Sequence, residues 1–306
     1  MLRVSVCVSV SRRRDASRRN EALRRGDARH RVSTKEKGID MDDVKSNAKK
    51  IQQRLQTIEQ ENGINIFWAC ESGSRAWGFP SQDSDFDVRF LYHHRTEWYL
   101  SIDNKRDVIE CPIEGLLDIN GWDIRKALRL LRKSNPVLLE WLHSPIVYQE
   151  KPTRVDLIRK LAPIYFSPVT CHYHYLHLAK NTVRRHLQNE LFNLKKIVYV
   201  LRPILACRWI EAELGIVPMS FETLLESLKE VTLKTAIRAL LERKKQGNES
   251  DFETASPVIM DFITDELARL SSLSYPKKKV PHSDTLDQLF RQILSKTSNV
   301  GDMIER

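Results

Sequence analysis

Acidic and apolar residues alternate at the start of residues 85–93, DFDVRFLYH. Alternate side chains of an extended strand lie on the same face, so Asp85 and Asp87 are expected side by side on one face. Phe86 and Val88 then point the other way, into an apolar core. The chain must therefore build a sheet in which one strand carries two neighbouring carboxylates.

Strand-like runs lie on both sides of this strand. Residues 64–70 (INIFWAC) predict a buried strand, and parts of residues 107–120 predict a third strand or a hairpin. The connection between the first two strands is rich in turn residues and has room for one short helix. A helix is predicted to begin at Met41, because apolar residues recur at spacings of seven, four and three: Val44, Ile51, Leu55 and Ile58.

The rest of the chain has the periodicity of helices. Asp123 is placed to cap a helix with an apolar stripe, and Pro136 is placed to begin another helix that runs through Leu142. Beyond residue 150 the sequence predicts no further strand, only helices at about 153–163, 167–188, 192–214, 221–246, 256–271 and 283–295.

These patterns predict an α+β fold. Residues 41–150 are expected to form a small mixed-sheet domain, and residues 151–306 an all-helical domain. Residues 1–40 are expected to be either a disordered basic tail or an overlong start, because Met41 opens the first helical pattern directly.

The formal net charge of +10 belongs mainly to this first segment. Residues 1–40 hold ten Arg and two Lys against five acidic residues, a net charge of +7, which leaves +3 for the rest of the chain. A basic tail and a basic surface have different physical meanings. The overall charge is therefore weak evidence that the folded part binds nucleic acid.

The sequence also bears on location. No run approaches the 18 or more consecutive apolar residues of a transmembrane helix, so no membrane contact is expected. The five cysteines are scattered, odd in number and without metal-ligand spacing, which favours a reducing compartment. We expect a cytoplasmic protein.

The carboxylate strand indicates a metal site. Two neighbouring carboxylates repel one another unless a positive charge lies between them, and oxygen ligands of this kind suit Mg²⁺. Gly73 and Ser74 follow the first strand, where a glycine lets the backbone approach a phosphate and a following helix supplies amide donors. A phosphate cradle that faces a metal site is typical of phosphoryl or nucleotidyl transfer.

The same residues carry a family resemblance. GSRAWG (73–78) followed by SDFD (84–87) resembles the Gly-Ser and Asp-x-Asp signature of the DNA polymerase beta superfamily of nucleotidyltransferases. More closely, the chain resembles RlaP, the RNA repair pathway DNA polymerase beta family. That resemblance extends through residues 121–142, 173–181 and 195–210 and excludes the tail.

The resemblance implies a metal-dependent transfer of a nucleoside monophosphate from a nucleoside triphosphate to an acceptor, with release of pyrophosphate. It assigns Asp85 and Asp87 as ligands of two Mg²⁺ ions, which Mn²⁺ can replace. A third carboxylate usually helps to activate the attacking hydroxyl. We predict Asp118 for this catalytic and metal-binding role, with Asp123 as the alternative, since Asp123 is also the expected helix cap.

Two groups of residues are predicted to bind the nucleotide. Gly73 and Ser74 would hold the triphosphate, and Arg75 would reach a phosphate unless it is a surface residue. In the helical part, the predicted residues fall on one helical face, at spacings of four and three: Lys195, Tyr199 and Arg202. Tyr199 as a core residue beside solvated or paired cations is the alternative for this face.

Several alternatives remain open from the sequence. The favoured acceptor is an RNA end, by the family's name alone, and a protein or small-molecule acceptor is the alternative. A domain that binds nucleotide or RNA without turnover is a third possibility. His172, His174 and His177 are expected to pack rather than bind a metal, because no carboxylate or cysteine completes a ligand set.

Overall fold

The computed structural model describes residues 41–81, 84–187, 192–246, 252–253, 256–276 and 281–295. The predicted tail, residues 1–40, lies outside the described residues, and so does Cys7. The other four cysteines are all free thiols. Among the helices within the described ranges, none is long and apolar enough to cross a membrane.

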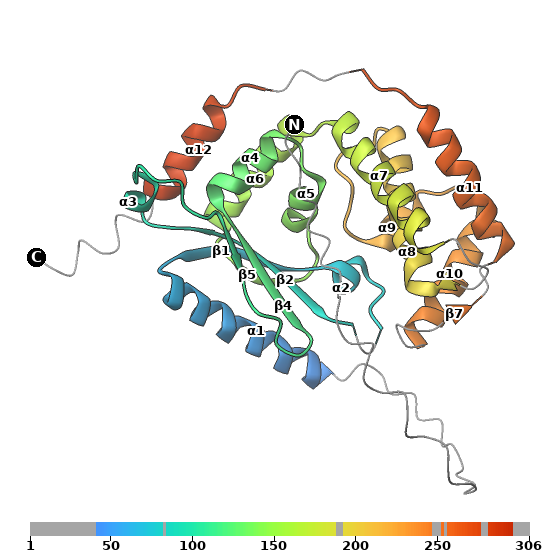
Figure 1. The fold of residues 1–306 in the computed structure, drawn as a ribbon, viewed down its shortest axis with the longest axis horizontal. Helices are drawn as coiled ribbons and strands as arrows, with labels where there is room; N and C mark the ends of the chain where they lie inside the picture. Colours follow the sequence, from blue (N-terminus) through green and yellow to red (C-terminus); the bar gives the residue numbers. More distant parts are fainter. Residues whose placement is uncertain are drawn as a thin grey trace, which may run out of the picture. The chain divides into compact units, whose positions relative to one another are not determined.

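The fold is α+β, as the sequence predicted, with one five-stranded mixed sheet (Figure 1). The strands of this sheet are β1 (Asn65–Ser72), β2 (Phe86–His93), β3 (Val108–Glu110), β4 (Leu117–Asp123) and β5 (Val147–Glu150). Their order is β3-β4-β2-β1-β5. The central strand β2 runs antiparallel to β1 and parallel to β4, while the edge strands β3 and β5 run antiparallel to their neighbours.

Helices cover both faces of the sheet (Figure 1). The first group is α1 (Met41–Asn62), α2 (Gly73–Trp77), α3 (Thr96–Tyr99), α4 (Ile124–Arg132), α5 (Pro136–Leu142) and α6 (Pro152–Tyr165). The second group is α7 (Pro168–His186), α8 (Leu194–Glu211), α9 (Phe221–Glu226), α10 (Val231–Gln246), α11 (Pro257–Ser272) and α12 (Asp284–Ser295). A two-residue pair, β6 (Phe192–Asn193) with β7 (Phe252–Glu253), lies among the second group.

One face of the sheet packs on α1. The buried side chains Ile51, Leu55 and Ile58 of that helix share an apolar cluster with residues of β1, β2 and β4. Phe90 of β2 belongs to this cluster and lies against Gly121 of the parallel strand β4, where an added Cβ would come within 2.1 Å of the Phe90 ring. A glycine in β4 therefore makes room for the aromatic ring of β2.

The opposite face packs on helices, and its apolar core continues into the helical part of the chain. Ile124 and Leu131 of α4 are buried in the same cluster as Leu201 and Ile204 of α8. α12 returns to pack against α4 and α6 (Figure 1). One continuous core thus extends on both sides of residue 150, the boundary predicted between the two domains.

Most expected elements lie where the sequence predicted them, and the differences have physical reasons. β5 was not predicted, and the pair β6 and β7 contradicts the expectation of no strand beyond residue 150, because two to four residues are too few for alternation to stand out. The helix expected at 221–246 is two helices, α9 and α10, with residues 227–230 between them. Ser227 ends α9 and its hydroxyl donates to the Leu224 carbonyl at 2.7 Å, a side-chain bond that competes with continued helix.

Candidate active site

The register of the sheet brings predicted carboxylates together. Asp87 on β2 lies opposite Ser72 on β1 and directly beside Asp118 on the parallel strand β4. Both acids occupy the face of the sheet opposite α1, because Val88 and Ile119 next to them pack on that helix. Asp85 immediately precedes β2 and is exposed. The three acidic residues assigned from the sequence thus lie at the same end of β2 and β4.

Gly73 meets the Asp87 carboxylate. It adopts a left-handed φ of 65° at the start of α2, and an added Cβ would lie 2.2 Å from Asp87 Oδ2. The glycine is therefore required both by the backbone conformation and by the space that the carboxylate occupies. This contact joins the Gly-Ser turn to the carboxylate strand.

Ser74 and Arg75 hold the loop that leads into β2. Ser74 is buried and its hydroxyl donates to Ser84 Oγ at 3.3 Å. The Arg75 guanidinium donates to the backbone carbonyls of Ser84, at 2.7 Å, and Asp85, at 3.1 Å, and lies 3.8 Å from the centroid of the Phe86 ring. The Ser74 and Arg75 side chains therefore hold the chain at Ser84 and Asp85 in place.

Arg89 was not singled out from the sequence, and it bridges the two strands of the site. One of its terminal nitrogens, Nη2, donates to Asp87 Oδ1 at 3.0 Å and to Asp118 Oδ2 at 2.8 Å. The other, Nη1, donates to the backbone carbonyls of Val88 and Asp118, each at 2.9 Å. Alternation along β2 puts Arg89 on the face of Asp87, but only the pairing of β2 with β4 reveals the second carboxylate.

Glu71 is a second residue that sequence reasoning left out of the site. Its buried carboxylate accepts from the Asp87 amide at 2.8 Å and from the Tyr148 hydroxyl at 2.5 Å. Burial raises the pKa of Glu71 to about 7, against the effect of these two hydrogen bonds. Glu71 thus supports the backbone of Asp87 from the α1 side of the sheet. Its partner Tyr148 comes from the unpredicted strand β5, so this contact could not be predicted from the sequence.

The surroundings of the Asp87 carboxylate disfavour its charged form, mainly because the group is buried. Burial raises the pKa of Asp87, and the neighbouring Asp118 and Asp85 raise it further, while Arg89 and Lys195 oppose the rise. Within the described ranges, no three or more His, Cys, Asp or Glu side chains converge as a ready metal cage. Mg²⁺ commonly takes only one or two carboxylates and completes its shell with phosphates and water, so the donor chemistry fits that ion.

Asp123, the alternative third carboxylate, lies at the other end of β4. It is opposite Tyr92 in the register, whereas Asp118 is opposite Asp87. Its carboxylate caps α4 by accepting from the Arg125 amide at 2.7 Å, and it also accepts from the Tyr99 hydroxyl at 2.6 Å. Asp123 is fully buried in these contacts. It serves as the helix cap that the sequence also predicted.

The predicted nucleotide-binding residues of α8 lie in two environments. Lys195 is close enough to lower the pKa of Asp87. Tyr199 packs edge-on against Trp77 of α2, with ring centroids 5.1 Å apart. Arg202 is only 2% exposed, donates to Glu140 at 2.9 Å and to the Met219 carbonyl at 3.3 Å, and lies over the same Trp77 ring. α8 therefore meets the Gly-Ser helix through Trp77, with Arg202 engaged by the protein.

His172 and His174 of α7 contact other groups of the protein. His172 is buried against Tyr275, and its Nε2 lies 3.4 Å from the Leu270 carbonyl. His174 packs edge-on against Tyr175. His177 is exposed.

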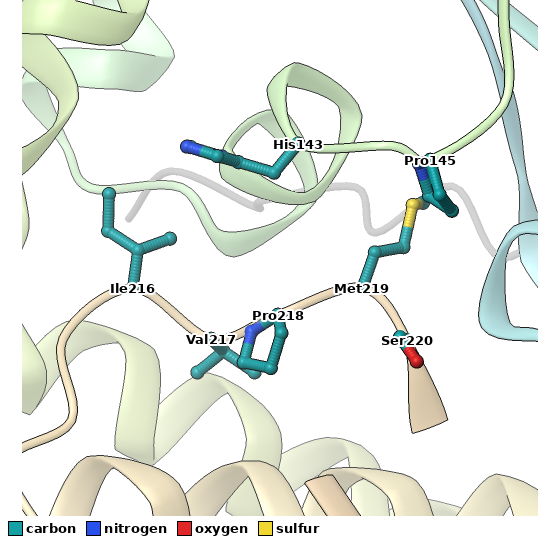
Figure 2. Close-up of a pocket in the computed structure, with 7 residues that line it drawn as sticks. All are labelled: His143, Pro145, Ile216, Val217, Pro218, Met219 and Ser220. Atoms are coloured by element: carbon teal, nitrogen blue, oxygen red, sulfur yellow. The ribbon is translucent and has the colours of Figure 1, made fainter. Parts of the chain in front are cut away.

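A cavity of about 300 Å³ opens beside the segment that supports Glu71 (Figure 2). Its lining is mainly apolar and comes from two loops: His143, Pro145, Ile216, Val217, Pro218, Met219 and Ser220. Ser144, between two of these residues, donates to the Glu71 carbonyl at 2.7 Å. None of the site residues predicted from the sequence lines this cavity.

Comparisons with known proteins identify the family of the chain. The family described as RlaP, RNA repair pathway DNA polymerase beta, matches residues 48–292. The chain is 49% identical over 247 residues to the uncharacterized protein YcgL of Bacillus subtilis (strain 168), an alignment that covers 80% of this chain and 95% of the relative. A nucleotidyltransferase-like protein of known structure from Exiguobacterium sibiricum 255-15 is 12% identical, with 82% of this chain and 90% of that chain covered and a TM-score of 0.27. That similarity is too low to bear on the site.

The α+β fold, with a Gly-Ser turn that contacts an Asp-x-Asp strand, accompanies a match to a DNA polymerase beta family. The chain belongs to the RlaP family, the RNA repair pathway DNA polymerase beta family.

Proposed function

We propose that this protein is a metal-dependent enzyme that transfers a nucleoside monophosphate from a nucleoside triphosphate to an acceptor hydroxyl and releases pyrophosphate. The observation that carries the proposal is the pairing of Asp87 with Asp118 on parallel strands, next to the Gly73 turn. Such transfer requires carboxylates that bind a divalent metal ion and a nearby turn that binds phosphate.

The acidic residues have different roles in the proposed reaction. Asp85 and Asp87 would hold Mg²⁺ or Mn²⁺, with Asp118 beside them. A bound divalent ion supplies charge neutralisation at the phosphates of the nucleotide. Asp118 would accept the proton of the attacking hydroxyl, a role that suits a carboxylate placed beside the metal-binding pair. Asp123, which caps α4, has no part in this proposal.

The phosphates would lie over the Gly-Ser turn. Because Gly73 has no side chain, the Asp87 carboxylate packs directly against the turn, so a phosphate bound at the turn would lie beside that carboxylate and the metal it would hold. Lys195, whose charge already acts on Asp87, would face the triphosphate from α8. Tyr199 would stack on the base. Ser74, Arg75 and Arg202 would act on the nucleotide by fixing the turn and the helix that bind it.

The acceptor is proposed to be an RNA end. Support comes from the description of the family as an RNA repair pathway family, and the chemistry at the carboxylates is the same for any hydroxyl acceptor. A protein or small-molecule acceptor would use the same residues. A domain without turnover would bind nucleotide but release no pyrophosphate.

One experiment separates these functions. The protein is incubated with each labelled nucleoside triphosphate, Mg²⁺ or Mn²⁺, and a pool of RNAs, proteins and small molecules, and both labelled product and pyrophosphate are followed. We expect metal-dependent label on RNA, abolished by Asp85→Asn combined with Asp87→Asn. The matched control is Asp156→Asn, which removes a half-buried acid of α6 that pairs with Arg159 and should leave transfer unchanged.

The outcomes are distinct. Label on protein or on a small molecule would replace the acceptor but keep the reaction. No transfer with any triphosphate, or equal transfer by the double Asn variant, would rule out the enzyme.

A further inference from the structure

The position between the Asp87 and Asp118 carboxylates is held by the Arg89 guanidinium. A single nitrogen of Arg89, Nη2, donates to both acids, at 3.0 Å and 2.8 Å. The Arg89 side chain is only 13% exposed, so solvent screens these two ion pairs weakly. A positive charge is therefore already present where the repulsion between the two carboxylates is greatest.

The backbone fixes this guanidinium independently of the carboxylates. Its Nη1 donates to the carbonyls of Val88 and Asp118, which belong to the paired strands β2 and β4. Those carbonyls stay in place whether or not the carboxylates bind another cation. The sheet backbone therefore holds the Arg89 side chain in place. A surface arginine, by contrast, is free to move when its carboxylate partner binds another cation.

The remaining oxygens of the pair have different neighbours. Asp118 Oδ1 accepts from Asn120 Nδ2 at 2.6 Å, and Asp87 Oδ2 faces Gly73. With Arg89 counted, the Asp87, Asp118 and Arg89 group carries a net charge of about −1 rather than −2 when both acids are ionised. A divalent ion approaching this group is attracted less strongly than by two free carboxylates.

We propose that Arg89 is a fixed internal cation of the site, which balances the Asp87 and Asp118 pair without metal and makes tight divalent-ion binding depend on the phosphates of the nucleotide. This inference rests on the proposed function, because it concerns the metal of that reaction. Arg89 acts through the carboxylates and is a positioning residue. The triphosphate brings the negative charge that the arginine has cancelled, so metal and nucleotide bind together.

The test measures Mn²⁺ binding by titration calorimetry on the full chain, without nucleotide and with a non-hydrolysable nucleoside triphosphate analogue. Without nucleotide, we expect Arg89→Gln to bind Mn²⁺ about tenfold more tightly than the parent protein, because it removes a nearby positive charge. The analogue should tighten Mn²⁺ binding strongly in the parent protein and less in the variant. Equal or weaker Mn²⁺ binding by Arg89→Gln would overturn the inference.

Two variants serve as controls. Arg54 of α1 also bridges two acids, Glu61 at 3.3 Å and Glu114 at 3.5 Å, but lies away from the site. Arg54→Gln should therefore not change Mn²⁺ binding. Arg89→Lys keeps the charge and should bind Mn²⁺ like the parent protein. If Arg89→Lys binds Mn²⁺ as tightly as Arg89→Gln, charge is not the cause and the inference fails.

A further pair covers the case in which Arg89→Gln does not fold. Asp118→Asn alone should weaken Mn²⁺ binding, and adding Arg89→Gln should restore it, because the charge then returns to that of the parent group. A merely structural arginine would give still weaker binding in the double variant. If the parent protein binds no Mn²⁺ even with the analogue, the proposed metal-dependent function itself fails, which is a different outcome from equal binding by the variants.

Discussion

At the scale of single residues, Gly73 gives the sharpest prediction. Gly73→Ala would place a Cβ 2.2 Å from Asp87 Oδ2 and keep a left-handed φ of 65°. We expect transfer to fall by about 100-fold or more, because the carboxylate must move, and stability to fall by more than the ~1 kcal/mol of the backbone strain alone. Transfer rates and urea denaturation measure the two effects.

Gly63 offers a matched control for this change. It has a similar φ of 58° at the end of α1, and an added Cβ would meet nothing within 4 Å. Gly63→Ala should therefore cost only about 1 kcal/mol of stability and leave transfer intact. Equal loss of activity in both alanine variants would show that the contact with Asp87 is irrelevant.

Glu71 predicts a dependence of stability on pH. Burial raises the pKa of its carboxyl from the ordinary 4.5 to about 7 in the folded protein. The folded state therefore prefers the protonated acid, and the contribution of Glu71 to stability is complete below pH 4.5 and is lost as the pH rises through about 7. The loss is on the order of 3 kcal/mol.

Glu71→Gln tests this dependence, because glutamine imitates the protonated acid. Relative to the parent protein, the variant should gain stability as the pH rises from 5 to 8 in metal-free buffer, as measured by urea denaturation at each pH. If the free energy of unfolding of both proteins changed with pH in the same way, Glu71 would not be the cause of the pH dependence.

At the scale of elements, β4 separates the two candidate third carboxylates. Asp118→Asn should reduce transfer by about 100-fold or more with little loss of stability, since it removes the proposed base beside Asp87. Asp123→Ala should instead lower stability by about 2 kcal/mol, because it removes the cap of α4 and leaves the Tyr99 hydroxyl without its acceptor. Parallel measurements of transfer and denaturation distinguish them, and abolished transfer in a folded Asp123→Ala protein would reverse the ranking.

The same strand shows what the sequence was able to predict. The alternation of residues 85–93 was enough to predict Val88 in the core and Asp87 on the opposite face of the strand, because that pattern depends only on a strand period of two. The bridge from Arg89 to Asp118 depends on which strands pair and in which register. Local periodicity carries no such information, so this part of the site came only with the structure.

At the scale of the whole molecule, the described helices and the sheet share one apolar core. Phe67 and Leu91 from the sheet belong to the same buried cluster as Leu201 of α8 and Leu289 of α12. Helical periodicity predicted the individual helices well, but not that α12 returns to α4 and α6. The return involves residues far apart in the chain. Substitutions in the helical part should therefore affect the Gly-Ser turn, because α8 contacts Trp77 of α2.

The buried pair of Arg202 and Glu140 tests this coupling. Arg202 lies over Trp77 of α2 and donates to Glu140, which also accepts from the Tyr175 hydroxyl at 2.6 Å. Arg202→Met leaves Glu140 buried without its cation, so we expect a loss of about 3–5 kcal/mol in urea denaturation. Combining Arg202→Met with Glu140→Gln should recover a large part of that loss, because no unpaired charge then remains.

The same double variant decides what Arg202 does for the nucleotide. If Arg202 acts by holding Trp77 and α8 in place, the double variant should bind a nucleoside triphosphate analogue as Glu140→Gln alone does, since both retain a packed core. Lys195→Met is the contrasting change, expected to weaken nucleotide binding about tenfold or more with little effect on stability, because Lys195 acts on the Asp87 site and is only half-buried. Weaker nucleotide binding by the double variant at restored stability would instead show that Arg202 contacts the nucleotide directly, as its place on the same helical face as Lys195 and Tyr199 first predicted.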